Sequence, residues 1–267
     1  MSDRLRIAAA QLTSTPDLDH NLALVEQASA DAAAQGARIV ACPEGTMAPF
    51  TERLDTLAEP LDGPFADGVR AIAERHGITV VVGMFTPGDE VDGRRRVRNT
   101  LLLTGPGAEA HYDKIHLYDA FGTLESETVQ PGEKHVIVEV EGWQVGLATC
   151  YDVRFADQFT ALGRLGAELI VLPTSWGDGP GKAEQWDLLT RARAADAQAW
   201  LLGAAQAWQE KSIKGPYGIG RSCVTGPMGQ VRARIDGAPA LLVTDIDRDA
   251  VRQARERVPI LATTLTR

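Results

Sequence analysis

The chain has 267 residues, of which 36 are acidic and 27 are basic, so its formal charge at pH 7 is −9. This acidic balance argues against binding to nucleic acid or to an anionic membrane, because phosphate binding needs clustered lysine and arginine. Apolar residues make up 44% of the chain, enough for the core of one large domain or two modest ones. The composition therefore excludes a disordered or collagen-like chain.

Cysteine usage and the first residues of the chain favour a reducing compartment. Cys42, Cys150 and Cys223 are far apart and odd in number, and the chain has no Cys-x-x-Cys motif. This spacing supports neither a disulfide framework nor a zinc site. No signal-like cleavage pattern follows Met1, and no stretch approaches the ~18 apolar residues of a membrane span. We expect a soluble, unprocessed, cytoplasmic protein without a metal or other cofactor.

The first part of the chain alternates short apolar runs with amphipathic stretches. We expect strands over Leu5–Leu12, Ala37–Ala41 and Ile78–Met84, and helices over Asp19–Gln35 and Phe65–His76. An order of strand, helix, strand, helix, strand implies helices layered on a sheet.

A dense basic run, Arg94-Arg95-Arg96 followed by Arg98, comes next in the chain. It lies in a turn-rich segment that contains Gly88 and Asp92-Gly93. We interpret the run as a solvated loop rather than a binding patch.

Hairpins then enter the pattern, so the sheet is expected to be mixed. Strands are predicted on either side of Gly105-Pro106-Gly107 within Asn99–Asp113, and over Val136–Val140, Trp143–Ala148, Leu169–Leu172, Trp200–Ala205, Val231–Ile235 and Leu241–Asp245. Helices are predicted over Phe155–Leu165, Lys182–Gln198 and Asp247–Arg257. Some ten to twelve strands and five helices suit two packed sheets with helices outside. Periodicity alone also allows a doubly wound sheet or a barrel.

Common catalytic motifs are absent from the sequence. There is no Gly-x-Ser-x-Gly elbow and no His-Glu-x-x-His, and the five histidines are scattered singly. The stretch Gly177–Ala183 resembles a P-loop, but it is one residue short and has Ala183 where a magnesium-binding Ser or Thr is needed. Serine hydrolysis, nucleotide binding and metal catalysis therefore lack support.

Three segments place a reactive residue where a predicted strand ends. Glu44 follows one strand, Lys114 lies in the alternating segment His111–Leu117, and Cys150 lies where a strand turns into a helix. Each has a structural alternative: a surface loop for Glu44, a salt bridge for Lys114 and a small core position for Cys150.

Together, a carboxylate, a lysine and a cysteine form a complete set for acyl transfer without histidine. We expect the start of the helix at Cys150 to lower the pKa of the thiol and to supply backbone N–H groups for an oxyanion. The carboxylate of Glu44 is suited to take the thiol proton, and the ammonium of Lys114 to stabilise the thiolate and the oxyanion.

At these residues the chain resembles the nitrilase superfamily of carbon–nitrogen hydrolases. The matching segments are Pro43-Glu44, Tyr112–Tyr118, Cys150–Phe155, Glu125-Ser126 ahead of Pro131-Gly132, and Gln185–Ala194. They occur in family order and at similar separations, and the resemblance spans Leu5 to about Asp245.

The resemblance implies a fold of the α/β (α+β) class, a four-layer α-β-β-α sandwich in a single domain over residues 1–267. It implies a triad of Glu44, Lys114 and Cys150 that cleaves a non-peptide C–N bond through a thioester. The backbone N–H of Tyr151 is expected to hold the oxyanion together with Lys114.

Two further roles follow from the resemblance. Glu125 is expected to position Lys114 and the substrate, with a loop carboxylate as the alternative. Trp176 is expected to line the pocket, with a core position as the alternative. We interpret Arg154 as the partner in a structural salt bridge, with a substrate carboxylate or a dimer contact as alternatives.

The segments around Lys114 and Cys150 are most similar to the branch that contains omega-amidases and deaminated glutathione amidases. The implied substrate is a small omega-amide that carries a carboxylate, hydrolysed with release of ammonia. N-carbamoyl hydrolysis, aliphatic amidase or nitrilase activity, and a catalytically silent ligand-binding scaffold are the alternatives. The chain departs from the branch pattern at Ala156-Asp157 and at Gln185. These departures bear on the substrate more than on the chemistry. The resemblance also implies a homodimer or larger homo-oligomer, formed through the helices after Cys150.

Overall fold

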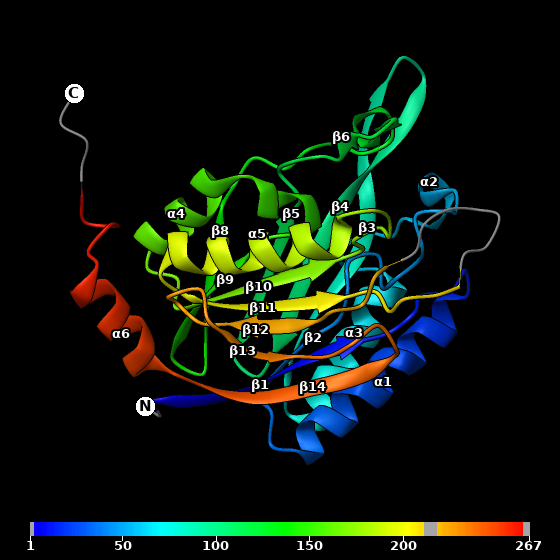
Figure 1. Cartoon of the computed structure of the whole chain (residues 1–267). Coiled ribbons are helices and arrows are strands. Elements are labelled where there is room, and N and C mark those ends of the chain that lie inside the picture. Colours follow the sequence, from blue (N-terminus) through cyan, green and yellow to red (C-terminus); the bar gives the residue numbers. More distant parts are fainter. Residues whose placement is uncertain (1–2, 211–217, 264–267) are drawn as a thin grey trace.

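Two six-stranded sheets face one another in the computed structural model, which describes residues 3–210 and 218–263 (Figure 1). The first sheet contains β1 (Arg4–Gln11), β2 (Ile39–Ala41), β3 (Thr79–Val91), β4 (Arg94–Gly105), β5 (Ala108–Asp113) and β14 (Ala240–Asp247). The second contains β8 (Val136–Val140), β9 (Trp143–Leu147), β10 (Leu169–Thr174), β11 (Trp200–Ala205), β12 (Cys223–Thr225) and β13 (Val231–Arg234). Their orders are β14-β1-β2-β3-β4-β5 and β13-β12-β11-β10-β9-β8.

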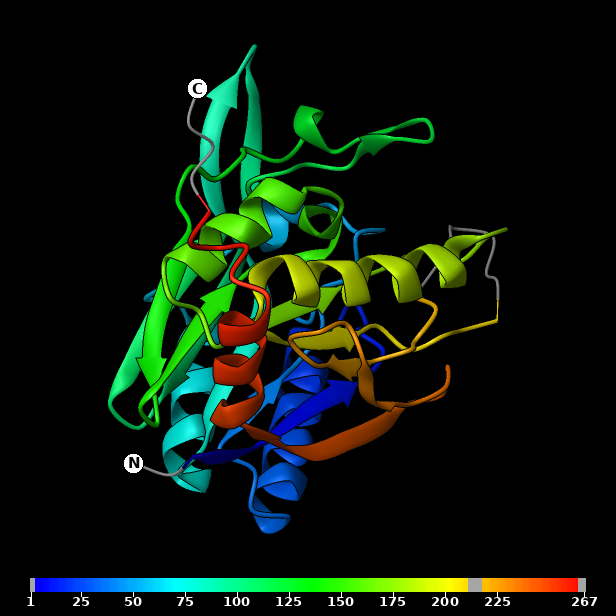
Figure 2. The same cartoon turned by 60° about the vertical axis from the view of Figure 1, so that its left-hand side comes forward.

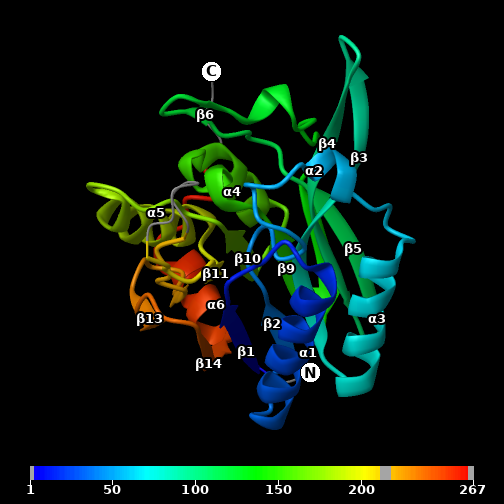
Figure 3. The ribbon, with the colours of Figure 1, turned by 90° about the vertical axis from the view of Figure 1, so that its right-hand side faces the viewer.

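Helices cover the outer faces of both sheets (Figures 2 and 3). The covering helices are α1 (Leu18–Ala34), α3 (Pro64–His76), α4 (Ala156–Arg164) and α5 (Lys182–Ala197). The short α2 (Leu54–Leu57) packs beside Phe85 and Val97. The last helix, α6 (Arg248–Arg257), packs Val251 against the core between the sheets. Figure 3 shows α1 and α3 against the first sheet and α4 and α5 on the opposite side of the molecule. A small hairpin of β6 (Asp119–Ala120) and β7 (Thr123–Leu124) and the 3₁₀ helices η1 (Glu125–Glu127) and η2 (Cys150–Arg154) lie in the connections.

Side chains that alternate between the two faces of each buried strand produce these layers. On β1, Ile7 and Ala9 point into the core between the sheets, whereas Ala8 and Ala10 point toward α1 and α3. A third apolar layer, which includes Phe159 and Trp186, packs α4 and α5 on the second sheet. Because both faces of these strands are buried, their sequences are nearly continuous apolar runs. The predicted four-layer α-β-β-α sandwich is confirmed.

Local signals set the helix ends that the periodicity predicted. The side chain of Asp17 accepts a hydrogen bond from the backbone N–H of His20 at the start of α1. Pro64 begins α3, and Gly77 ends it with a φ of 58°. Each helix and strand predicted in the chain has a counterpart, although β3 runs past the expected Met84 to Val91 and β4 begins at Arg94, before the expected Asn99.

The segment around the basic run corrects one interpretation. β3 and β4 continue beyond the sandwich as a projecting hairpin, in which Glu90 pairs with Arg95 (Figure 1). Its turn, Asp92-Gly93, has positive φ at both residues, which matches the right-handed twist of the strands. Arg94 and Arg95 are exposed as expected, whereas Arg96 and Arg98 are partly buried in ion pairs with Asp89 and Asp113. The backbone is a strand and not a loop, because pairing with β3 compensates for the polar sequence.

Short elements escaped the sequence analysis. α2, β6, β7 and β12 have two to four residues each, too few to show a period. Within the described part of the chain, no helix combines the length and apolar character needed to cross a membrane. The single domain over residues 1–267 stays a prediction, and residues 1–2, 211–217 and 264–267 lie outside the described residues.

Candidate active site

The predicted site residues follow the ends of strands and lie at one edge of the sandwich. Glu44 lies shortly after β2, Lys114 directly follows β5, and Cys150 begins η2 after β9. Within the first sheet β2 and β5 point the same way, because β3 is parallel to β2 and two antiparallel pairings lead from β3 to β5. Their carboxyl ends therefore share an edge, which is where crevices of α/β sheets open.

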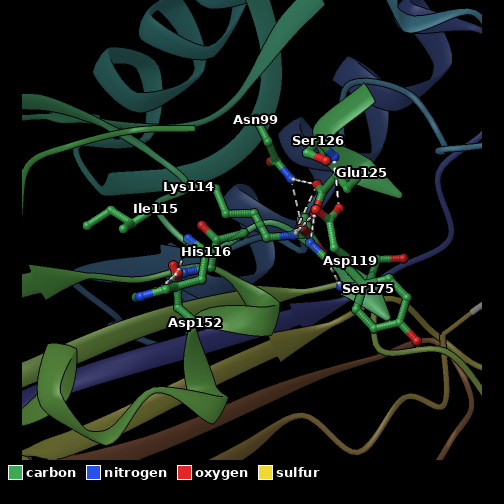
Figure 4. Close-up of polar contacts among 12 residues, drawn as sticks. Asn99, Lys114, Ile115, His116, Asp119, Glu125, Ser126, Asp152 and Ser175 are labelled. Carbon is green, nitrogen blue, oxygen red and sulfur yellow. Dashed lines mark hydrogen bonds and ion pairs between the residues drawn. The ribbon is translucent and has the colours of Figure 1, made fainter. Parts of the chain in front are cut away.

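A buried lysine bridges two glutamates at this edge. The Lys114 Nζ atom lies 2.9 Å from Glu44 Oε1, 2.9 Å from Glu125 Oε2 and 3.1 Å from Glu125 Oε1 (Figure 4). The side chains of Lys114 and Glu44 are 2% exposed, and that of Glu125 is 7% exposed. Removing one partner of such a buried group costs about 3–5 kcal/mol, because a charge is left without compensation.

Two more donors fix the Glu44 carboxylate. The amide of Asn99 donates to Oε1 over 2.8 Å, and the backbone N–H of Ser175 donates to Oε2 over 2.8 Å. Asn99 also donates to Glu125 over 3.3 Å, so it joins both carboxylates. The sequence analysis missed Asn99, whose one signal is an amide at the start of the apolar part of β4. It also missed the role of Ser175, because a backbone donor leaves no signal in the sequence.

The charge state of the lysine follows from its two neighbours. Burial lowers the pKa of Lys114, but the carboxylates of Glu125 and Glu44 outweigh burial and hold this pKa well above its ordinary value. The ammonium is therefore retained throughout the neutral and mildly alkaline range.

The cysteine occupies a backbone elbow. Cys150 has a φ of 43°, which is unusual for a residue with a side chain, at the first position of η2. Burial raises the pKa of its thiol, Glu44 raises it further, and Lys114 lowers it, with a net result well above the ordinary value. The expectation that the helix start lowers this pKa is wrong in its net direction, because desolvation and the nearby carboxylate outweigh it.

A cavity of about 1250 Å³ opens beside the cysteine. Its volume exceeds the roughly 300–1,000 Å³ that is usual for small-molecule sites. Its wall includes each of the predicted site residues, namely Glu44, Lys114, Glu125, Cys150, Tyr151 and Trp176. The cavity is also lined by Phe50, by the run Glu52–Asp55, by the tip of the β3–β4 hairpin and by part of the stretch that resembles a P-loop.

Two cations flank Trp176 on this wall. The Arg154 Cζ atom lies 4.9 Å and the Lys182 Nζ atom 5.7 Å from the centre of a Trp176 ring. Lys182 also lies 4.0 Å from the ring centre of Phe121, on the β6–β7 hairpin. Desolvation and the charge of Arg154 lower the pKa of Lys182. Sequence reasoning missed both Lys182 and Phe121.

The predicted salt bridge of Arg154 is not found. Among the described residues no carboxylate lies within 4.0 Å of its guanidinium, which donates to the side-chain oxygen of Gln185 over 2.7 Å. Its Nε is buried and has no hydrogen-bond partner among these residues. The described part of the chain also contains no group of three His, Cys, Asp or Glu side chains placed to hold a metal ion.

Comparison of the sequence with known families gives one match over most of the chain. The profile described as carbon-nitrogen hydrolase matches residues 6–256. A Mycobacterium tuberculosis protein named only as a hydrolase is 48% identical over 96% of this chain and 94% of its own length. The deaminated glutathione amidase of Escherichia coli O157:H7 is 32% identical over 96% and 95%, and an omega-amidase of Xenopus tropicalis is 30% identical over 96% and 94%.

Solved structures share the fold. Nit3 of Saccharomyces cerevisiae, a member of the nitrilase superfamily, superimposes with a TM-score of 0.84 and 25% identity over 100% of this chain and 98% of its own. A variant of the amidase of Nesterenkonia sp. AN1, in which acrylamide has added to the active-site cysteine, gives a TM-score of 0.74 and 29% identity over 96% and 98%. These similarities extend to the whole sandwich and not only to the segments around the cysteine.

Proposed function

The chain belongs to the carbon–nitrogen hydrolase family, and from this premise we propose that it hydrolyses the amide bond of a small, carboxylate-bearing molecule through a thioester on Cys150. The observation that carries the proposal is the buried cluster in which Lys114 bridges Glu44 and Glu125 on the wall that also exposes Cys150. A carboxylate, an ammonium and a thiol on one cavity wall support the roles of base, oxyanion partner and nucleophile. Acyl transfer requires a nucleophile, a general base and a group that stabilises the oxyanion.

In the first step the thiol of Cys150 gives its proton to the carboxylate of Glu44, and the sulfur attacks the amide carbon. A C–S bond forms while the C=O electron pair moves onto oxygen. Lys114 Nζ and the backbone N–H of Tyr151 would hold this oxyanion. The raised pKa of the Cys150 thiol supports a base that acts at the moment of attack, because the resting thiol keeps its proton at neutral pH.

In the second step the oxyanion collapses and the C–N bond breaks. Glu44 returns the proton to the departing nitrogen, which leaves as ammonia or as an amine and leaves a thioester on Cys150. Water then attacks the thioester while Glu44 takes its proton. Collapse of this second intermediate breaks the C–S bond and frees the carboxylic acid, and Glu44 returns its proton to the sulfur, which restores the thiol.

The cation pair at Trp176 supports a substrate that carries a carboxylate. Arg154 and Lys182 face the same cavity without a carboxylate partner among the described residues, and one N–H of Arg154 is buried and unpaired. Both side chains are partly buried on the cavity wall, so an anionic group of the substrate is a fitting partner for their charges. The omega-amides of small keto acids have such a group at the end opposite to the amide.

The proposed cysteine nucleophile requires a reducing compartment. The three cysteines are free and buried in the structure, and the proposed nucleophile must remain reduced. A cytoplasmic location meets this requirement.

An activity screen tests the proposed reaction. Purified protein is incubated with α-ketoglutaramate, deaminated glutathione and propionamide, and the released ammonia or amine is measured, with Cys150→Ala as the control. We expect release from one or both carboxylate-bearing amides, little from propionamide and none by the control. Failure to release product from any amide, with Cys150 shown intact by mass spectrometry, contradicts the proposal.

Mass spectrometry after brief exposure to substrate separates an enzyme from a silent scaffold. We expect an acyl adduct on the peptide that contains Cys150. Binding of substrate by both the wild type and Cys150→Ala, without an adduct in the wild type, indicates a binding protein of the same fold.

A further inference from the structure

Asp152 is a buried acid that the proposed reaction does not use. It lies two residues after Cys150, its side chain is 0% exposed, and it is not part of the cavity wall. Among the described residues no lysine or arginine lies within 4.0 Å of its carboxylate; the one ring nitrogen at ion-pair distance belongs to His116. A carboxylate in such a place must be satisfied by hydrogen bonds.

Four hydrogen bonds from described residues meet this carboxylate. Oδ2 accepts from the hydroxyl of Tyr112 over 2.6 Å and from the backbone N–H of Thr149 over 2.8 Å. Oδ1 accepts from the backbone N–H of His116 and from its ring Nδ1, each over 3.0 Å (Figure 4). Both oxygens are therefore fixed in direction.

The donors lie on the two segments that carry the proposed oxyanion groups. Tyr112 and His116 stand two residues before and two residues after Lys114, and Thr149 directly precedes Cys150. Tyr112 belongs to β5 of the first sheet, whereas Thr149 follows β9 of the second. The carboxylate thus connects residues 112–116, the lysine segment, to residues 149–151, the cysteine elbow, across the space between the sheets. We call this connection the joint.

Neighbouring contacts complete the joint. The hydroxyl of Tyr112 accepts from the backbone N–H of Ile115 over 3.2 Å and from the Gln158 amide over 2.9 Å, so it is saturated. The His116 ring stacks on Phe155 with ring centres 3.6 Å apart and planes 8° apart. Burial and the charge of Asp152 raise the pKa of Tyr112, which keeps its hydroxyl a donor.

We propose that Asp152 is a positioning residue, whose carboxylate fixes the lysine segment to the cysteine elbow so that Lys114 Nζ and the Tyr151 N–H converge on one oxyanion position. The elbow needs such support, because Cys150 holds a positive φ that residues with a side chain seldom adopt. Asp152 touches neither the substrate nor the reacting atoms. The inference rests on the proposed function for its kinetic consequence, but not for its effect on the thiol.

Kinetics of Asp152→Asn give the first test. The asparagine amide presents a donor where a carboxylate oxygen now accepts, so the joint loosens while the cavity wall is unchanged. We expect kcat to fall about 10- to 100-fold with KM within a factor of about 3, as for other residues that orient a catalytic group. Asp196→Asn, on α5 and away from the cavity, is the matched control and should keep the wild-type kcat.

Alkylation of Cys150 gives a second test that needs no substrate. The rate of iodoacetamide labelling at pH 8 is followed by mass spectrometry of the Cys150 peptide. Lys114 lowers the pKa of this thiol, so a displaced lysine should slow labelling in Asp152→Asn. A residue that only supports the fold would change the melting temperature and leave the labelling rate unchanged.

The outcomes separate the two proposals. Should Asp152→Asn fail to fold, Tyr112→Phe removes one of the four bonds and should give a smaller fall in kcat and a smaller fall in the labelling rate. Folded variants with the kcat and the labelling rate of the wild type overturn the positioning role. A wild type that hydrolyses no amide overturns the proposed function, and the labelling rate then still decides the role of Asp152.

Discussion

At the scale of single residues, the environment of Cys150 determines how it would react. Burial and the Glu44 carboxylate raise the pKa of its thiol, while Lys114 opposes them. The same carboxylate is hydrogen-bonded to Asn99 and to the backbone of Ser175, so it cannot swing away from the thiol without losing those bonds. We infer a protonated resting thiol with a fixed base beside it, in contrast to a preformed thiolate.

Replacement of Glu44 tests this inference, because it should have opposite effects on the labelling of Cys150 and on turnover. Because the Glu44 charge raises the pKa of Cys150, Glu44→Gln should lower that pKa and speed iodoacetamide labelling at pH 8. Turnover should nevertheless fall about 10²- to 10⁴-fold, because the base is lost. Initial rates and labelling rates of the same samples check both effects, with Glu139→Gln on the exposed part of β8 as the control. Unchanged turnover would contradict the role of Glu44 as base.

The three cysteines should behave differently from one another. Burial raises the pKa of Cys42 to about 12 and that of Cys223 to about 11, and neither residue lines the large cavity. Cys150→Ala should abolish turnover, whereas Cys42→Ser and Cys223→Ser should keep most of it at a cost in stability of about 1–3 kcal/mol each. Activity assays measure the turnover of the three variants, and thermal melts measure their stability. Equal losses of activity at all three positions would mean that the assignment of the nucleophile is wrong.

At the scale of elements, the loop that carries Glu44 rests directly on strand β3. A Cβ atom added at Gly83 would lie 2.7 Å from the backbone N of Gly45, 2.8 Å from the carbonyl oxygen of Pro43 and 2.9 Å from Cα of Glu44. Real contacts are not that short, so the absence of a side chain at Gly83 lets β3 pass beneath the loop. This backbone contact holds the Glu44 loop close to the sheet, in addition to the hydrogen bonds that Asn99 and Lys114 make to the Glu44 carboxylate.

Gly83→Ala should displace the Glu44 loop. We expect turnover to fall about 10²-fold, because small misplacements of a reacting group have effects of that size. The matched control is Gly68→Ala on α3, where the added Cβ would meet only the movable side chain of Leu22. Steady-state rates and melting curves of both variants check the prediction. Wild-type turnover in a folded Gly83→Ala would show that the loop adjusts without effect on the base.

At the scale of the whole molecule, association of two chains is implied by the family resemblance. The helices after Cys150 are α4 and α5, and α5 carries Leu188 with 66% of its surface exposed. A large apolar side chain on a helix surface is a common part of an interface. The homodimer stays a prediction of the resemblance, and Leu188 gives it a place on the surface.

Sedimentation velocity tests this arrangement. The wild type should sediment as a dimer or larger assembly across the micromolar range, and Leu188→Asp should shift it toward the monomer while the circular dichroism spectrum is kept. Val91→Asp, at the tip of the β3–β4 hairpin and 44% exposed, is the control for an added charge elsewhere. A monomeric wild type, or equal effects of both substitutions, would contradict an interface on α5.

The order of elements and the layered architecture could be read from the sequence. Apolar runs such as Leu169–Leu172 are buried on both faces, and this double burial is a local property that the residues themselves express. The sequence also predicts Glu44, Lys114 and Cys150 as site residues, because each follows a strand and matches a family segment, and the three share one cavity wall. Strand direction then brings these ends to one edge.

Only the tertiary structure decided how these groups act on one another. The high pKa of Cys150, the support of Glu44 by Asn99 and Ser175, and the joint at Asp152 depend on residues up to 131 positions apart in the chain. Burial and distance set the strength of a charge or a hydrogen bond, and neither is a property of the local sequence. The residue types of the site are therefore a matter of sequence, whereas their protonation and alignment are a matter of packing.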